Sequence, residues 1–108
     1  MEKPAYFIID VQIKDAERIK PYQLAVEATY TAFGGQRIAA SGLVEVLEGD
    51  GPRGVVVILQ FPSLAQAHAW HDSPQYQSIL GHRLAAAESH AYLVEGLAPA
   101  SAPTISIQ

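Results

Sequence analysis

The chain has 108 residues, of which 49% are hydrophobic and 17% are charged, and its formal net charge is −4 at pH 7. This length and composition are typical of one globular domain, and they argue against a disordered or fibrous chain. The absence of cysteine excludes disulfides, zinc–thiolate sites, iron–sulfur clusters and thiol nucleophiles, and the acidic balance argues against nucleic acid as a partner.

Ala5 to Ile13 is the first predicted strand, because most of its residues are apolar and many are β-branched or aromatic. This apolar run is shorter than a signal peptide or a membrane-spanning helix requires. We therefore expect a cytoplasmic protein with no membrane partner.

A helix is predicted next, from Pro21 to about Phe33, after a loose turn over residues 15–20 in which Asp15 is a plausible N-cap. The residues that recur at helical spacing and form its expected inward face are Tyr22, Val26, Thr29, Tyr30 and Phe33. Gly34-Gly35 ends this helix, because glycine adopts the left-handed C-cap conformation without steric cost.

Residues 36–48 form a second predicted strand, which is long enough that Gly42 near its middle suggests a bulge or bend. A glycine-rich turn over residues 48–54 then leads into a third predicted strand, Val55 to Phe61. The two strands should form a hairpin.

The second helical region opens at Pro62-Ser63 and is interrupted at Ser73-Pro74, a pair that suits an N-cap followed by the first helical residue. We therefore expect a helix of about two turns and then a second helix from Pro74 to about Glu88. The expected inward residues of this second helix are Tyr76, Ile79, Leu80, Leu84 and Ala87. The last predicted strand is Ala91 to Glu95.

This order of elements predicts an α+β fold, the ferredoxin-like βαββαβ sandwich, in which a four-stranded antiparallel sheet carries its helices on one face. Residues 1–97 form the expected domain. Residues 98–108 are rich in alanine, proline and serine, and we expect a tail that is either flexible or docked on a partner.

Both faces of the central strands are largely apolar. A sheet with one face exposed to solvent should instead have strands in which apolar and polar residues alternate. In the third strand Val55, Val57 and Leu59 share one face, while Val56 and Ile58 lie on the other. Two amphipathic helices cover only one face, so we expect a homodimer in which a second protomer covers the other.

Several short motifs resemble the domain of unknown function 1330 family, and the likeness extends from Ala5 to about Gly96. The residues that carry it are Gly34-Gly35, Glu45-Val46-Leu47-Glu48-Gly49, Phe61-Pro62-Ser63, Ala67, Trp70, Ser73-Pro74 and Tyr76. The resemblance implies a dimeric α/β barrel, a superfamily that includes cofactor-free monooxygenases, isomerases, cyclases, haem enzymes and ligand-binding regulators. The function is therefore not fixed by membership.

Members of that family often carry an arginine in the second strand, where this chain has Ala40-Ser41-Gly42. Arg37 lies three residues before Ala40 and is expected to point to the opposite face of the sheet. We include Arg37 among the candidate substrate-binding residues.

Candidate catalytic residues are His71 and Asp10. His71 precedes the break at Ser73-Pro74, where a helix end commonly lies near the rim of a cavity, and Asp10 is a polar residue on an otherwise buried strand. His68 and His71 share a helix face, but no acidic residue completes a metal-binding pattern, and no dinucleotide or phosphate-loop motif is present. We expect neither a metal nor a cofactor.

The first functional hypothesis is a cofactor-free enzyme or binder of a small apolar or aromatic molecule, with a pocket between sheet and helices. The expected lining residues are Tyr22, Phe33, Trp70, His71 and Tyr76, and catalysis would use proton transfer by His71 or Asp10. The alternative is a non-catalytic dimeric ligand-binding, structural or regulatory module, in which Trp70 and Tyr76 pack tightly with no cavity beside them. Haem binding through a histidine is a third, more distant alternative.

Overall fold

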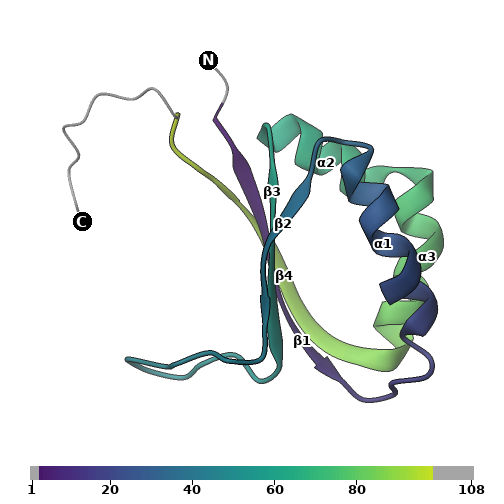
Figure 1. Cartoon of the computed structure of the whole chain (residues 1–108), viewed down its shortest axis with the longest axis vertical. Helices are drawn as coiled ribbons and strands as arrows, with labels where there is room; N and C mark the ends of the chain where they lie inside the picture. The colour runs from purple at the N-terminus through teal and green to yellow at the C-terminus, as the bar shows by residue number, and fades with distance from the viewer. Residues whose placement is uncertain (1–2, 99–108) are drawn as a thin grey trace.

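The computed structural model describes residues 3–98 and forms the predicted ferredoxin-like sandwich. Its elements are β1 (Ala5–Ile13), α1 (Lys20–Thr31), β2 (Gln36–Ser41), β3 (Val55–Phe61), α2 (Leu64–Asp72), α3 (Pro74–Ala86) and β4 (Ala87–Glu95). The four strands form one sheet in the order β2-β3-β1-β4, and the three helices cover one face of it (Figure 1). The predicted tail beyond residue 98 lies outside the described residues.

All strand pairs are antiparallel, and their register separates the sheet into the two faces that the alternation predicts. Phe7 is paired with Leu59, and Ile9 with Val57, on the face toward the helices. Ile8 is paired with Ile58 on the opposite face, which we call the outer face.

The hydrophobic core lies between the sheet and the helices, where Phe61, Trp70 and Tyr76 are the largest fully buried side chains. The Trp70 ring centroid lies 5.0 Å from that of Phe7, 5.2 Å from that of Phe61 and 4.2 Å from that of Tyr76. Trp70 Nε1 also donates a hydrogen bond of 3.0 Å to Thr29 Oγ1. Aromatic packing and one buried hydrogen bond therefore fix α2 against α1 and the sheet.

Local contacts and backbone conformation define the turns at both ends of α1. Asp15 Oδ1 accepts hydrogen bonds from the amides of Glu17 and Arg18, so it stabilises the turn before the helix, whereas the N-cap position itself is Ile19, without a side-chain cap. After the helix, Gly34 has φ +81°, and a Cβ on Gly35 would lie 2.7 Å from the Phe61 ring. The glycine pair thus ends the helix as predicted and permits close approach to the sheet.

Two segments differ from the predicted strands. The second strand ends at Ser41 rather than continuing to Glu48, and residues 42–54 form an exposed connection that projects from the sheet (Figure 1). The last strand begins at Ala87, four residues before the predicted start, because its first residues pair with Gln12 and Ile13 of β1.

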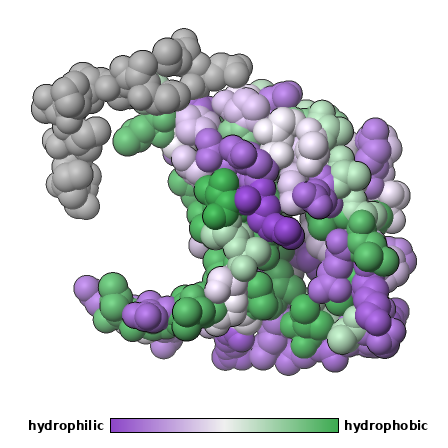
Figure 2. Space-filling model, viewed as in Figure 1, coloured by the Kyte–Doolittle hydropathy of each residue, from purple (hydrophilic) through white to green (hydrophobic). Residues whose placement is uncertain are grey.

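Exposed apolar residues occur on the outer face and on the β2–β3 connection. Tyr92, Val94 and Ile38 of the sheet and Leu43, Val44, Val46 and Leu47 of the connection are exposed large hydrophobic side chains. Figure 2 shows apolar side chains along the projecting connection. Among the described residues, no helix is long and apolar enough to cross a membrane.

Ser73 joins α2 to α3 and caps both of them. Its Oγ accepts a hydrogen bond of 3.2 Å from the Tyr76 amide, and it donates one of 2.7 Å to the Trp70 carbonyl. The predicted break at Ser73-Pro74 is therefore confirmed, with Ser73 as the N-cap of α3 and Pro74 as its first residue.

We expect Ser73→Ala to lower the free energy of unfolding by about 1 kcal/mol, because the first turn of α3 loses its side-chain acceptor. Urea unfolding followed by circular dichroism measures this change. Ser78→Ala is the matched control, since the Ser78 hydroxyl is exposed and donates to the Gln75 carbonyl within the same helix, and its effect should stay within about 0.5 kcal/mol. Equal effects of the two variants would contradict the capping role.

Candidate functional site

A cavity of about 260 Å³ lies between the sheet and the helices α1 and α3. The sheet wall consists of Phe7, Ile9, Val11 and Ile13 of β1, Val55, Val57 and Leu59 of β3, and Arg37 and Ala40 of β2. The helix wall consists of Ile19, Tyr22, Gln23, Val26 and Tyr30 on and just before α1, together with Arg83 of α3. Most of this lining is apolar, which is typical of sites for small organic molecules.

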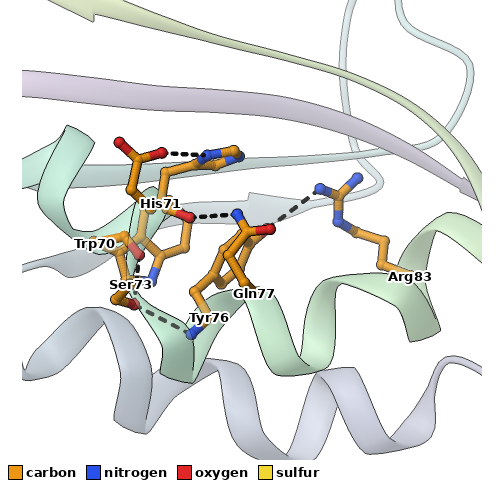
Figure 3. Close-up of polar contacts among 7 residues, drawn as sticks. Trp70, His71, Ser73, Tyr76, Gln77 and Arg83 are labelled. Atoms are coloured by element: carbon orange, nitrogen blue, oxygen red, sulfur yellow. Dashed lines mark hydrogen bonds and ion pairs between the residues drawn. The ribbon is translucent and has the colours of Figure 1, made fainter.

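Hydrogen bonds connect the polar groups at the α1–α3 side of the cavity. The hydroxyl groups of Tyr22 and Tyr76 lie 2.9 Å apart, and Arg83 Nη2 donates to the Tyr76 hydroxyl at 3.3 Å. The Arg83 guanidinium lies 5.4 Å from the centre of the Tyr22 ring, within the range of a cation–π contact. Figure 3 shows Arg83 extending from α3 with its guanidinium toward Tyr76.

Tyr22 lines the cavity with a phenol that stays protonated. Burial, and then the neighbouring Tyr76 hydroxyl, raise the pKa of Tyr22 above its ordinary value of 10. At neutral pH Tyr22 is therefore an uncharged hydrogen-bonding group and not a base.

Arg37 also lines the cavity, and here the structure corrects the predicted orientation. Arg37 is paired with Leu59 and Ala40 is paired with Val57, so both belong to the helix-facing side of the sheet. The register shifts between Arg37 and Ala39, because a β-bulge inserts Ile38 as one extra residue in β2. Ala40 therefore faces the same side of the sheet as Arg37.

Trp70, Tyr76 and Phe33 do not contribute to the cavity lining. Trp70 and Tyr76 are fully buried in the core, and Phe33 is a partly buried residue that packs against the same cluster. Tyr76 acts at the cavity indirectly, because its hydroxyl contacts both Tyr22 and Arg83.

His71 lies at the end of α2, where its side chain is 40% exposed and its Nδ1 is 3.8 Å from Asp72 Oδ1. Its ring contacts those of Trp70 and Tyr76, and its carbonyl accepts a hydrogen bond from Gln77 Nε2 (Figure 3). His71 does not line the cavity. A role in proton transfer for His71 would therefore need a site other than this one.

Asp10 lies on the outer face of the sheet, the side away from the cavity. Its Oδ1 is 3.3 Å from His90 Nδ1 on the neighbouring strand β4. Arg37 is on the helix-facing side of the sheet, so the two candidate residues lie on opposite faces. Asp10 lines a second hollow on the outer face with Ile8, Val56 and Tyr92 and with part of the β2–β3 connection.

Arg83 was not among the residues that the sequence singled out, and the structure places it in the cavity wall with an exposed fraction of 4%. The helical spacing assigned Leu84 to the inward face, but Leu84 is 61% exposed. Arg83 follows Tyr76 by seven residues, which is two helical turns, so this spacing is the signal that could have indicated it.

No three histidine, aspartate or glutamate side chains gather as metal ligands would within residues 3–98. His68, the other histidine of the predicted helical pair, is exposed on α2.

Residues 4–97 match the family described as Domain of unknown function (DUF1330). Among curated proteins no relative was found.

Solved structures share the fold at low sequence identity. A protein of unknown function from Rhodopseudomonas palustris is 22% identical, with a TM-score of 0.74 over 92% of this chain and 86% of that one. A dimeric ferredoxin-like protein of unknown function from Jannaschia sp. CCS1 is 12% identical, with a TM-score of 0.68 over 85% of this chain and 98% of that one. SnoaB, a cofactor-independent oxygenase from Streptomyces nogalater, is 14% identical, with a TM-score of 0.63 over 94% of this chain and 99% of that one.

Proposed function

The chain belongs to the DUF1330 family, whose description names no activity, and we propose from the cavity that it binds a small cyclic or aromatic molecule between sheet and helices. The observation that carries this proposal is the cavity itself, about 260 Å³ with a mainly apolar lining and few polar groups. Protein interiors are normally packed without such spaces. A cavity of this composition therefore supports binding of a small organic molecule.

The enzymatic form of the proposal is a cofactor-free conversion of the bound ring, by proton transfer, isomerisation, cyclisation or oxygenation. One protein of the same fold, SnoaB, is a cofactor-independent oxygenase, which supports this class of chemistry without fixing it. In this chain the residues with polar side-chain groups that line the cavity are Tyr22, Gln23, Tyr30, Arg37 and Arg83. These groups can hydrogen-bond to a substrate and stabilise developing negative charge.

A non-catalytic dimeric module, which binds a ligand or serves a structural or regulatory role, is the second candidate. The observation that favours it is the complete burial of Trp70 and Tyr76 at the break between α2 and α3. Their rings pack 4.2 Å apart, as a structural role requires. Trp70 and Tyr76 do not line the cavity. A purely structural or regulatory module predicts that the cavity binds no small molecule, and a ligand-binding module predicts binding without turnover.

We also propose that the protein is a homodimer in which the outer faces of two sheets meet. Its support is the row Ala39, Ile58, Ile8 and Tyr92, which crosses all four strands on the face that no helix covers. An apolar sheet face of this kind is stabilised when a second copy removes it from water. A dimeric ferredoxin-like protein among the solved structures of the same fold is consistent with this arrangement.

We expect the variant Gln23→Trp to block the cavity, because Gln23 is exposed and lines the cavity wall on α1. The neutral two-ring compound 2-naphthamide is the probe, and its binding is followed by amide chemical shifts in β1 and β3. The variant should bind it roughly tenfold more weakly or worse, a loss of about 1.4 kcal/mol.

Leu24→Trp is the matched control for that experiment. Leu24 is the next residue of α1, is 85% exposed and does not line the cavity, so this variant should bind the probe as the wild type does. If the wild type binds neither this probe nor its carboxylate analogue 2-naphthoate, or if both tryptophan variants weaken binding equally, binding in the cavity is contradicted.

A further inference from the structure

Arg83 is a buried cation with an incomplete set of partners. Its exposed fraction is 4%, its Nη1 donates to Ser89 Oγ of β4, and its Nη2 donates to the Tyr76 hydroxyl. Its Nε is buried and has no hydrogen-bond partner. Ser89, Tyr76 and the Tyr22 ring are neutral side chains, so none of these three described neighbours supplies a negative charge.

Buried guanidinium groups in proteins are normally paired with a carboxylate, since an uncompensated charge away from water is costly. Within residues 3–98 the ion pairs are Lys20–Glu17, His71–Asp72 and His90–Asp10, and none of them includes Arg83. Arg83 therefore lacks a counter-ion in the described part of the chain.

The charge of the cavity wall is opposite to that of the whole chain. The chain has a formal net charge of −4, yet Arg83 and Arg37 both line the cavity, and none of the lining residues found in the described structure carries a carboxylate. A mainly apolar cavity with two arginines and no acid suits a molecule that has an apolar ring and an anionic group.

On the basis of the proposed function, we infer that the ligand of this cavity is a small aromatic or alicyclic carboxylate whose anionic group is bound by Arg83. The ring would contact the apolar sheet wall at Ile9, Val57 and Leu59. The Ser89 and Tyr76 hydroxyls accept hydrogen bonds from Nη1 and Nη2 of the guanidinium, and these bonds orient the charge before the ligand binds. Each of these two Nη groups uses only one of its two hydrogens in the bond described, so the guanidinium in the cavity wall keeps N–H donors for a carboxylate oxygen.

Two probes of the same shape test this inference on the wild-type protein. 2-Naphthoate carries a carboxylate, and 2-naphthamide replaces it with a neutral group of similar size. Calorimetric titration at pH 7 should show that naphthoate binds about tenfold more tightly or better, the difference expected of a charge-assisted hydrogen bond, and that this preference decreases with added salt.

Arg83→Met should remove the preference for naphthoate, because the charged donor is lost, while the affinity for naphthamide stays within about threefold, because the apolar sheet wall is unchanged. Arg83→Lys keeps the charge and should retain part of the preference, which keeps the test decisive if the methionine variant does not fold. Arg53→Met is the matched control, because Arg53 is exposed on the β2–β3 connection and does not line the cavity; it should bind as the wild type does.

The failures of the two proposals are distinguishable. Equal affinity of the wild type for both probes would overturn the carboxylate inference and leave binding in the cavity standing. A preference that survives in Arg83→Met but is lost in Arg37→Met would overturn the assignment to Arg83. Binding of neither probe would overturn the inference together with the proposed function.

Discussion

Replacing Trp70 by alanine should lower the free energy of unfolding by about 3–5 kcal/mol, the range for removing a fully buried tryptophan. The indole is completely buried among Phe7, Phe61 and Tyr76, so its removal leaves a cavity in the core. The buried hydrogen bond from Nε1 to Thr29 Oγ1 is lost as well. Since small domains are stable by only about 5–15 kcal/mol, this is a large fraction of the total.

Urea unfolding followed by far-ultraviolet circular dichroism measures the effect without relying on tryptophan fluorescence. Trp70→Phe keeps an aromatic ring and should cost less, about 1–3 kcal/mol, for lost contacts and one hydrogen bond. His68→Ala, an exposed change on the same helix, should stay within about 0.5 kcal/mol. A loss below about 1 kcal/mol for Trp70→Ala would show that the packing around α2 contributes little to stability.

The sequence was sufficient to predict the strands whose apolar residues alternate without interruption. β1 and β3 have the predicted bounds, because their apolar residues are mostly β-branched or aromatic and recur at every second position. The start of β4 could not be predicted, since Ala87 to His90 contains no β-branched or large aromatic residue. Only the pairing of Ala87 with Ile13 and of Glu88 with Gln12 makes these residues a strand.

The orientation of Arg37 illustrates a different limit. A bulge at Ile38 reverses the parity of every residue after it. The sequence suggested a bulge or bend at Gly42 instead, and β2 itself contains neither glycine nor proline. Such a bulge is decided by how β2 fits against β3, which is a tertiary property. The consequence is that Arg37 and Ala40 share the cavity wall, although simple alternation separates them.

The sequence does not identify Arg83 as a site residue, because near the end of α3 the more hydrophobic residue is not the one in the inward helical position. Leu84 is the more apolar residue, but Arg83 continues the stripe that begins at Tyr76, and the structure buries the arginine and exposes the leucine. A charged residue in an inward helical position is a conflict between local preference and the fold, and such conflicts are expected at functional sites. The candidate site was therefore only partly visible in the sequence, through Tyr22 and Arg37.

We expect Ile58→Glu to convert a dimer into a monomer. Ile58 lies near the centre of the outer face, opposite Ile8 on β1 and Ala39 on β2. Sheet-to-sheet association would bury an unpaired carboxylate at that point, at a cost of about 3–5 kcal/mol, which weakens association roughly a hundredfold or more. In the separated protomer the same carboxylate reaches water at the half-buried outer face, so the chain should remain folded.

Light scattering after size-exclusion chromatography measures this change. The wild type should have about twice the chain mass of 11.6 kDa, and Ile58→Glu should have the chain mass with an unchanged circular dichroism spectrum. Leu84→Glu is the matched control, because Leu84 is exposed on α3, on the helical side of the domain, and this variant should stay dimeric. A monomeric wild type would contradict the homodimer, and a dimeric Ile58→Glu variant would place its interface somewhere other than the outer face.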